Sequence, residues 1–172
     1  MVATVQYGSA NLDGPDNFDE YFTFTDLFSF ARVAPTPFHA RARFWDLGTV
    51  VVTDHTMGPV LATRGREQLR AAPADHLTLM VVHDGSLTHE AESSETAGPG
   101  DVLLFDYGRS FAYRTDGHSG ACLSIARALI EDRQGSVAWH GLLPATAETG
   151  LFADLMRALV RQLPDLDPAS EP

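Results

Sequence analysis

Lysine is absent from this chain of 172 residues, and cysteine occurs once, at Cys122. A single cysteine excludes an internal disulfide and any metal site built from several cysteines. The apolar run around Cys122 predicts a buried, inert thiol. Long hydrophobic runs are also lacking, because no stretch approaches the roughly 20 apolar residues that span a bilayer. The N-terminus has neither the basic start nor the apolar core of a signal peptide. We therefore expect a cytoplasmic protein with no membrane partner.

Positive charge is scarce along the whole sequence. All twelve basic residues are Arg, and 23 acidic residues bring the net charge to −11. Nucleic-acid binding needs a basic footprint, and no helix-turn-helix, zinc-finger or RNA-binding motif is visible. We therefore expect no nucleic-acid contact through this chain itself. A hydrophobic share of 44% in a chain of this length suits one domain with a sizeable core.

The chain from residue 40 onward contains short β-rich runs separated by turn residues. Asp84-Gly85 predicts a hairpin turn and Asp116-Gly117 a further turn, because such pairs tolerate positive φ. Many short, evenly spaced strands are typical of an antiparallel sandwich or barrel. The predicted strands are Ala40–Asp46, Thr49–His55, Val60–Thr63, Glu67–Ala71, Leu77–Val82, Leu87–Ala91, Val102–Phe105, Phe111–Arg114 and Ala121–Ala126.

The two ends of the chain differ from this β-rich region. Residues 1–16 are expected to be a flexible lead-in, and Asn17 is placed to cap a short helix over residues 18–28. The aromatic side chains of that segment predict a lid or plug. Near the other end, helical spacing of apolar residues predicts a helix over 146–163 that Pro164 ends. The predicted units are a barrel domain over 17–130, a helical element over 131–164 and a flexible tail over 165–172.

Few residues form recognisable catalytic patterns. The sequence has no Gly-x-Ser-x-Gly elbow, phosphate-binding loop or dinucleotide fingerprint. Three of the seven histidines, His76, His83 and His89, are close in sequence across one predicted hairpin. They are either strand-end histidines or a displaced metal site. His76 and His83 are seven positions apart, so on a regular strand they point to opposite faces, which favours the first interpretation.

The turn Gly98-Pro99-Gly100-Asp101, which leads into a predicted strand, resembles the second conserved motif of the cupin superfamily. That resemblance implies a double-stranded β-helix, or jelly-roll, barrel. It also indicates where metal-dependent cupins carry their ligands. Those positions hold non-ligands in this chain: Arg70, Ala72, Thr78 and Phe111. Because transition metals need several N, O or S donors, we expect neither a metal nor another cofactor.

A narrower resemblance extends over about residues 17–163. The segments that carry it, in order, are Phe44–Val52, Thr63–Arg70, Asp75–Ser86, Gly98–Asp106 and Leu123–Ile130. Together they resemble the N-terminal ligand-binding domain of AraC-type transcription regulators. The resemblance implies a mainly β, cupin-like barrel with an N-terminal aromatic segment and C-terminal helices. It also implies a small-molecule effector and a homodimer. We expect no DNA-binding part within this chain, which is either a piece of a longer regulator or a stand-alone protein that has lost that part.

Three functions are compatible with these features. The first is small-molecule sensing and dimerisation for an AraC-type regulator, without catalysis. The second is a stand-alone, metal-free cupin-like enzyme, such as an isomerase or cyclase, that uses the barrel for acid–base chemistry. The third is a degenerate barrel that serves as an interaction scaffold. Folds host many functions, so the site has to discriminate among them.

Two sets of residues are predicted to carry the sensing function. Strand alternation and the former metal positions predict a cavity that holds a mostly apolar ligand with an anionic or carbonyl group; its lining is Arg70, Thr78, Met80, Val82, Phe111 and Tyr113. Adjacent apolar pairs widen one face of the C-terminal helix beyond a single stripe. That face predicts a dimerisation surface formed by Leu151, Phe152, Leu155, Met156 and Leu159.

Overall fold

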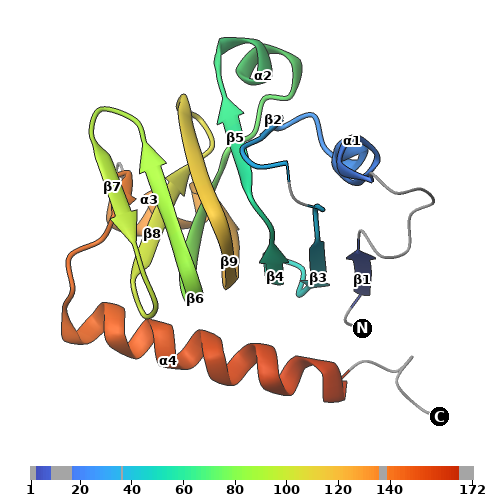
Figure 1. Ribbon diagram of the computed structural model, residues 1–172. Helices are drawn as coiled ribbons and strands as arrows, with labels where there is room; N and C mark the ends of the chain where they lie inside the picture. The colour runs from blue at the N-terminus through green and yellow to red at the C-terminus, as the bar shows by residue number, and fades with distance from the viewer. Residues whose placement is uncertain (1–2, 9–16, 36, 136–138, 167–172) are drawn as a thin grey trace.

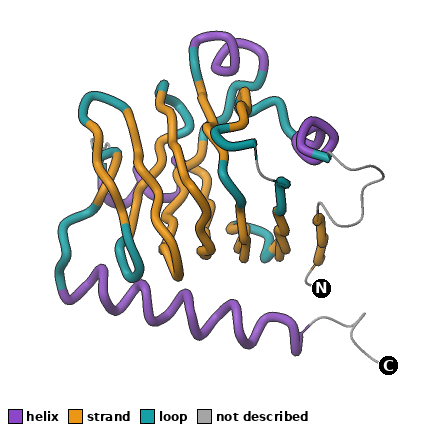
Figure 2. Tube along the Cα trace, viewed as in Figure 1, coloured by secondary structure: helices purple, strands orange, loops and turns teal. Residues whose placement is uncertain are grey.

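The computed structural model describes residues 3–8, 17–35, 37–135 and 139–166 (Figure 1). Antiparallel strands dominate, and helices occupy the connections and the C-terminal region (Figure 2). The strands are β1 Ala3–Gly8, β2 Ser29–Arg32, β3 Ala40–Asp46, β4 Val50–Met57, β5 Val60–Arg64, β6 His76–Glu90, β7 Ser94–Ala97, β8 Val102–Asp106, β9 Phe111–Ala126 and β10 Gly141–Leu142. The helices are α1 Phe18–Tyr21, α2 Arg66–Ala71, α3 Arg127–Gln134 and α4 Ala147–Gln162, with 3-10 turns η2 Phe22–Phe24 and η3 Leu163–Leu166.

The two longest strands, β6 and β9, pair along nearly their whole length and belong to both halves of the barrel. Residues 118–125 of β9 pair with β4, which continues through β3 to β1. Residues 111–115 of β9 pair instead with β5, which pairs with β2. This division of two long strands between two sheets gives the predicted mainly β, cupin-like jelly roll.

The glycines of the predicted turns lie at bends in continuous strands. Gly85 has φ +76°, yet β6 runs through it with register shifts on either side, and its partner in β9 is His118, next to Gly117. The hairpin prediction at Asp84-Gly85 was therefore wrong. Positive φ at a glycine also suits a β-bulge, which bends a strand without reversing it. The predicted strands Leu77–Val82 and Leu87–Ala91 are the two arms of β6, and β9 unites a second such pair.

Several shorter segments differ from the secondary structure that the sequence predicts. The predicted strand Glu67–Ala71 is helix α2, whose start is held by a hydrogen bond of 3.1 Å from the Gly65 amide to Gln68 Oε1. Within the predicted flexible lead-in, residues 3–8 form β1, paired with β3. The predicted helix over 18–28 shortens to α1 and η2. In the motif turn, Asp101 Oδ2 accepts a hydrogen bond from the Gly98 amide at 2.9 Å.

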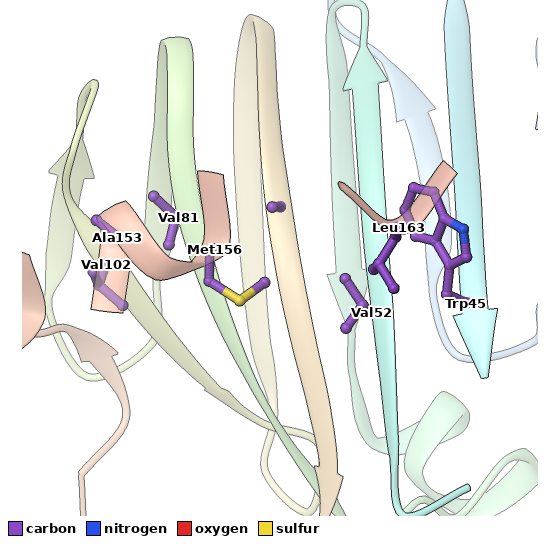
Figure 3. Packing of buried hydrophobic residues seen from close by; sticks show 8 residues of the cluster. Trp45, Val52, Val81, Val102, Ala153, Met156 and Leu163 are labelled. Atoms are coloured by element: carbon purple, nitrogen blue, oxygen red, sulfur yellow. The ribbon is translucent and has the colours of Figure 1, made fainter. Parts of the chain in front are cut away.

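Helix α4 packs on the outer face of the sheet that contains β3, β4, β9, β6 and β8. Its predicted bounds are confirmed to within one residue. Thr146 caps its first turn, because the Thr146 hydroxyl accepts from the Thr149 amide. Ala153, Met156 and the following Leu163 pack against strand side chains of the first core cluster, among them Val81 and Trp45 (Figure 3). Residues 167–172, most of the predicted tail, lie outside the described part of the chain, and the proposed unit boundaries stay predictions.

Candidate functional site

The inner faces of the strands and the N-terminal aromatic segment surround a cavity of about 520 Å³. A volume of this size suits a drug-sized ligand. The inward side chains come from alternate positions of β4, β6 and β9, as the two-residue period of strands requires. Aromatic and aliphatic side chains dominate the wall, including Tyr21, Phe22, Leu27, Phe28, Phe30, Phe44, Val51, Met57, Met80, Leu87, Phe105, Tyr107, Phe111, Tyr113 and Ile125.

Four of the six residues predicted to bind ligand line this cavity, namely Thr78, Met80, Phe111 and Tyr113. Thr78 and Phe111, the former metal positions, are almost fully buried, at 3% and 4% exposure. Val82 is also buried, but it packs within the neighbouring core cluster and is outside the cavity lining. The alternation that predicted it is interrupted just after Val82, where β6 bulges.

Arg70 does not reach the cavity, and the prediction that it lines the wall was wrong. It is exposed on α2, because the segment that was expected to be a strand is helical. The buried arginine of this region is Arg64, at the end of β5. Its guanidinium donates to the carbonyl oxygens of Leu27, Ala72 and Tyr107 at 2.8–3.0 Å. Those bonds tie the N-terminal segment, α2 and the barrel together.

The aromatic segment covers one side of the cavity. Phe22 stacks on Phe30 with a centroid separation of 3.7 Å. Phe28 meets Tyr107, Phe111 and Tyr113 edge-on at 5.6–5.9 Å. Offset and edge-to-face contacts of this kind stabilise aromatic clusters beyond the area that they bury. The predicted lid is therefore present, although strand β2 and short helical turns form it where one helix was expected.

One group of polar side chains on the wall consists of hydroxyls. The Thr78 and Ser124 hydroxyls, on neighbouring strands β6 and β9, share a hydrogen bond of 2.8 Å. Tyr107 lies within hydrogen-bonding reach of Thr78, and burial raises the pKa of its phenol. Burial also raises the pKa of Tyr113. Each of these groups is therefore uncharged at neutral pH and offers hydrogen bonds without charge.

A second polar group joins β4 and β9. His55 and His118 share a hydrogen bond of 3.0 Å between their Nε2 atoms, and Cys122 Sγ lies 4.0 Å from His55 Nδ1. Burial, followed by the neighbouring His118 and His83, lowers the pKa of His55 to about 3, and burial lowers that of His118 to about 4. Burial likewise raises the pKa of Cys122 to about 12. All three groups are neutral at pH 7, and His118 Nδ1 has no hydrogen-bond partner within the described part of the chain.

The His55–His118 pair could be recognised only from the pairing of two strands, and alternation along one strand does not reveal it. His55 and His118 are far apart in the chain and meet only because β4 and β9 pair, with His55 opposite Gly120. Alternation along a single strand relates only histidines that are close in sequence, such as His76, His83 and His89. Of those, His76 lines the cavity and His83 does not, which agrees with opposite faces. Cys122 faces the cavity from the run that predicted a buried thiol.

Among the residues that the structure describes, no three His, Cys, Asp or Glu side chains are grouped so as to hold a metal ion. A second histidine pair, His89 and His140, lies by a separate surface pocket, with 3.3 Å between their Nε2 atoms. His140 Nδ1 there accepts from the Asp106 amide. This bond gives His140 a structural role in holding the β10 connection to β8.

The exposed face of α4 carries part of the predicted dimerisation set. Leu151 and Leu155 are 72% and 59% exposed, and Leu159 is half-buried. Met156 is 1% exposed and Phe152 packs against the same core cluster, so these two contact the barrel of their own chain. The wide face of the helix is thus divided between two surfaces, one packed and one open.

These features define a class of protein, a mainly β, cupin-like barrel domain that encloses an apolar cavity and carries a long helix outside. The sequence matches the AraC-binding-like domain family over residues 27–172. The chain therefore belongs to the AraC-binding-like family, as the sequence resemblance predicted. Among the described residues, no helix is long and apolar enough to cross a membrane.

Among solved structures, one similar to this chain shows the same fold, and two others match it more weakly. The AraC-like transcriptional activator CuxR is 17% identical, with a TM-score of 0.85; the match covers 98% of this chain and 64% of CuxR. This chain therefore spans less than two thirds of that activator. Ectoine synthase from P. lautus is 14% identical, with a TM-score of 0.41 and coverage of 79% and 93%. A cupin-like protein from Thermotoga maritima is 13% identical, with a TM-score of 0.40 and coverage of 73% and 87%. The sequence matches no curated protein.

Proposed function

We propose that this domain is the sensing part of an AraC-type transcription regulator and binds a small-molecule effector in its barrel cavity. The observation that carries the proposal is the cavity of about 520 Å³ lined mainly by aromatic and aliphatic side chains. Membership of the AraC-binding-like family supports the regulatory role. The proposal assigns no nucleic-acid contact to this chain, whose net charge of −11 opposes one.

The proposal includes a homodimer formed through α4. Leu151 and Leu155 lie on the side of the helix that faces away from the barrel, where they are exposed to solvent. A two-fold dimer places the same patch on both partners, so one helix face is sufficient. Phe152 and Met156, which contact the barrel, support that surface from beneath and do not belong to it.

The enzyme hypothesis is less well supported by the same cavity. Acid–base catalysis is most efficient with a group whose pKa lies near the working pH. The pKa values of His55 and His118 lie at about 3 and 4, and that of Cys122 lies at about 12. Burial also lowers the pKa of His76, the third histidine on the wall. These groups are suited to hydrogen bonding in fixed neutral forms.

The test is a thermal-shift screen of uncharged and charged fragments against the wild type and a blocked-cavity variant. Ser124→Phe places a ring in the cavity, and Ser94→Phe adds the same ring at an exposed site on β7. A fragment at 100 times its Kd stabilises the fold by about 2.7 kcal/mol. We expect that shift in the wild type and Ser94→Phe, and its loss in Ser124→Phe. Equal shifts in all three proteins, or none in any, would contradict the proposal.

A further inference from the structure

We propose that the effector is an uncharged, largely aromatic molecule whose hydrogen-bond acceptor binds Nδ1–H of His118. This inference rests on the proposed function and gives the chemical class of the ligand. The sequence led us to expect an anionic or a carbonyl group on the ligand, and the inference keeps the carbonyl and drops the anion, because the arginine assigned to the wall lies elsewhere.

The cavity wall carries no formal charge. None of the described residues that line it is an Asp, Glu, Arg or Lys. The buried cation of this region, Arg64, lies near Tyr107 and directs its guanidinium to three main-chain carbonyls. An ionised ligand would therefore lose its hydration shell without gaining a counter-charge, and an unpaired buried charge is strongly disfavoured.

The histidines do not supply that charge either. Burial holds the pKa of His55 and His118 near 3 and 4, and His76 is shifted in the same direction. At neutral pH the wall offers only neutral imidazoles, hydroxyls and a thiol. Selection against ions therefore follows from the composition of the cavity as well as from its burial.

The hydrogen-bond partners assign the tautomers of the histidine pair. The Cys122 thiol is protonated and lies 4.0 Å from His55 Nδ1, and we assign the thiol as the donor of this contact. His55 then carries its proton on Nε2 and donates it to His118 Nε2. This leaves the His118 proton on Nδ1. That atom is buried and has no partner among the described residues, so a ligand acceptor at this point satisfies it.

The remaining surface selects for flat rings. Phe22, Phe30 and Phe44 come from the N-terminal half of the domain, and Phe105 and Phe111 come from β8 and β9. Rings on several sides of one cavity favour a planar aromatic ligand, which makes stacked and edge-to-face contacts with them. The Thr78–Ser124 hydroxyl pair adds a second uncharged polar contact.

The experiment compares four tricyclic probes by calorimetric titration at pH 7. Fluorene has no polar group, and 9-fluorenone adds one carbonyl acceptor. Fluorene-9-carboxylate is an anion, and its methyl ester is the uncharged match. We expect 9-fluorenone to bind about 5-fold more tightly than fluorene, as one added hydrogen bond predicts. We expect the ester to bind at least about 100-fold more tightly than the carboxylate, because the latter buries an unpaired charge.

His118→Leu removes the proposed donor, and His39→Leu is the matched control at an exposed histidine. We expect His118→Leu to bind fluorenone and fluorene equally, and His39→Leu to keep the wild-type preference. Nitrogen-15 NMR of the unliganded wild type reports the tautomer directly, whether or not the variant folds. A proton on Nδ1 of His118 supports the inference, and a proton on Nε2 overturns it.

The outcomes separate this inference from the proposed function. Carboxylate binding that equals or exceeds ester binding, and that Ser124→Phe abolishes, overturns the ligand class but leaves the cavity as a binding site. Failure of all four probes to bind the wild type overturns both. Tighter binding of fluorenone and the ester, lost in Ser124→Phe, supports both.

Discussion

Arg64 makes more main-chain contacts than the other arginines for which the structure gives hydrogen bonds. Lysine at this position keeps the charge but cannot span three carbonyls from different segments. We expect Arg64→Lys to lower the free energy of unfolding by about 3 kcal/mol, roughly 1 kcal/mol for each lost bond. Urea unfolding measures the change. Arg70→Lys, on the exposed side of α2, should shift stability by less than about 0.5 kcal/mol; equal effects would contradict the assigned role.

The buried histidine pair makes stability depend on pH. The folded-state pKa of His55 and His118 lies at about 3 and 4, below the ordinary 6.5, so the unfolded chain binds more protons between these values. Stability is therefore full above pH 6.5 and falls as the pH drops toward 4. Each histidine contributes up to about 1.4 kcal/mol per pH unit in this window.

His118→Leu removes only the contribution of His118 to the pH dependence of stability. Other histidines with lowered pKa values, among them His89 and His140, remain in the variant. We expect the slope of unfolding free energy against pH between 6 and 4.5 to decrease by up to about 1.4 kcal/mol per unit. Chemical denaturation at several pH values measures it. An unchanged slope in His118→Leu would show that its imidazole is not buried as described.

At the residue scale, two-residue alternation together with the cupin metal-ligand positions correctly predicted Thr78, Met80, Phe111 and Tyr113 on the cavity wall. The metal-ligand position failed for Arg70, because a short helix with a side-chain cap replaced the expected strand. Contacts such as His55–His118 depend on which strands pair, and that information is not local. A single sequence therefore predicted the wall but not its polar centre.

At the scale of elements, the bends in β6 and β9 decide how two sheets share two strands. A methyl group on Gly85 would lie 2.2 Å from the Gly117 carbonyl oxygen, at a positive φ. We expect Gly85→Ala to destabilise the fold by more than about 3 kcal/mol, because it adds a backbone clash to the cost of the left-handed conformation. Differential scanning calorimetry measures the loss.

Gly48→Ala separates these two contributions. Gly48 has φ +88° but open space around it, so alanine there incurs only the conformational cost of about 1–2 kcal/mol. A Gly85→Ala protein as stable as Gly48→Ala would mean that the two strands separate easily at the bend.

Composition and spacing predicted the mainly β barrel. An Asp-Gly pair such as Asp84-Gly85, however, fits a turn and a β-bulge equally well until its partner strand is known.

At the scale of the whole molecule, the exposed leucines of α4 predict a homodimer. Leu155→Glu places a charge on the exposed face of α4 without touching the barrel core. We expect the wild type to be dimeric at tens of micromolar, an order-of-magnitude choice for moderate affinity, and Leu155→Glu to be monomeric and folded. Light scattering and circular dichroism check both. Gln162→Glu, exposed on the same helix, should stay dimeric; a monomeric wild type would contradict the dimer proposal.

The partition between the cavity and α4 is one strand thick. Met80 and Cys122 face the ligand space, while their chain neighbours Val81 and Ala121 support the helix on the other side. Because interiors are close-packed, a side chain pushed outward by a bulky occupant displaces its own backbone. The same peptide units then move Val81 and Ala121, on which α4 packs. We therefore expect a bulky occupant of the cavity to shift α4 directly, because the same two strands contact both.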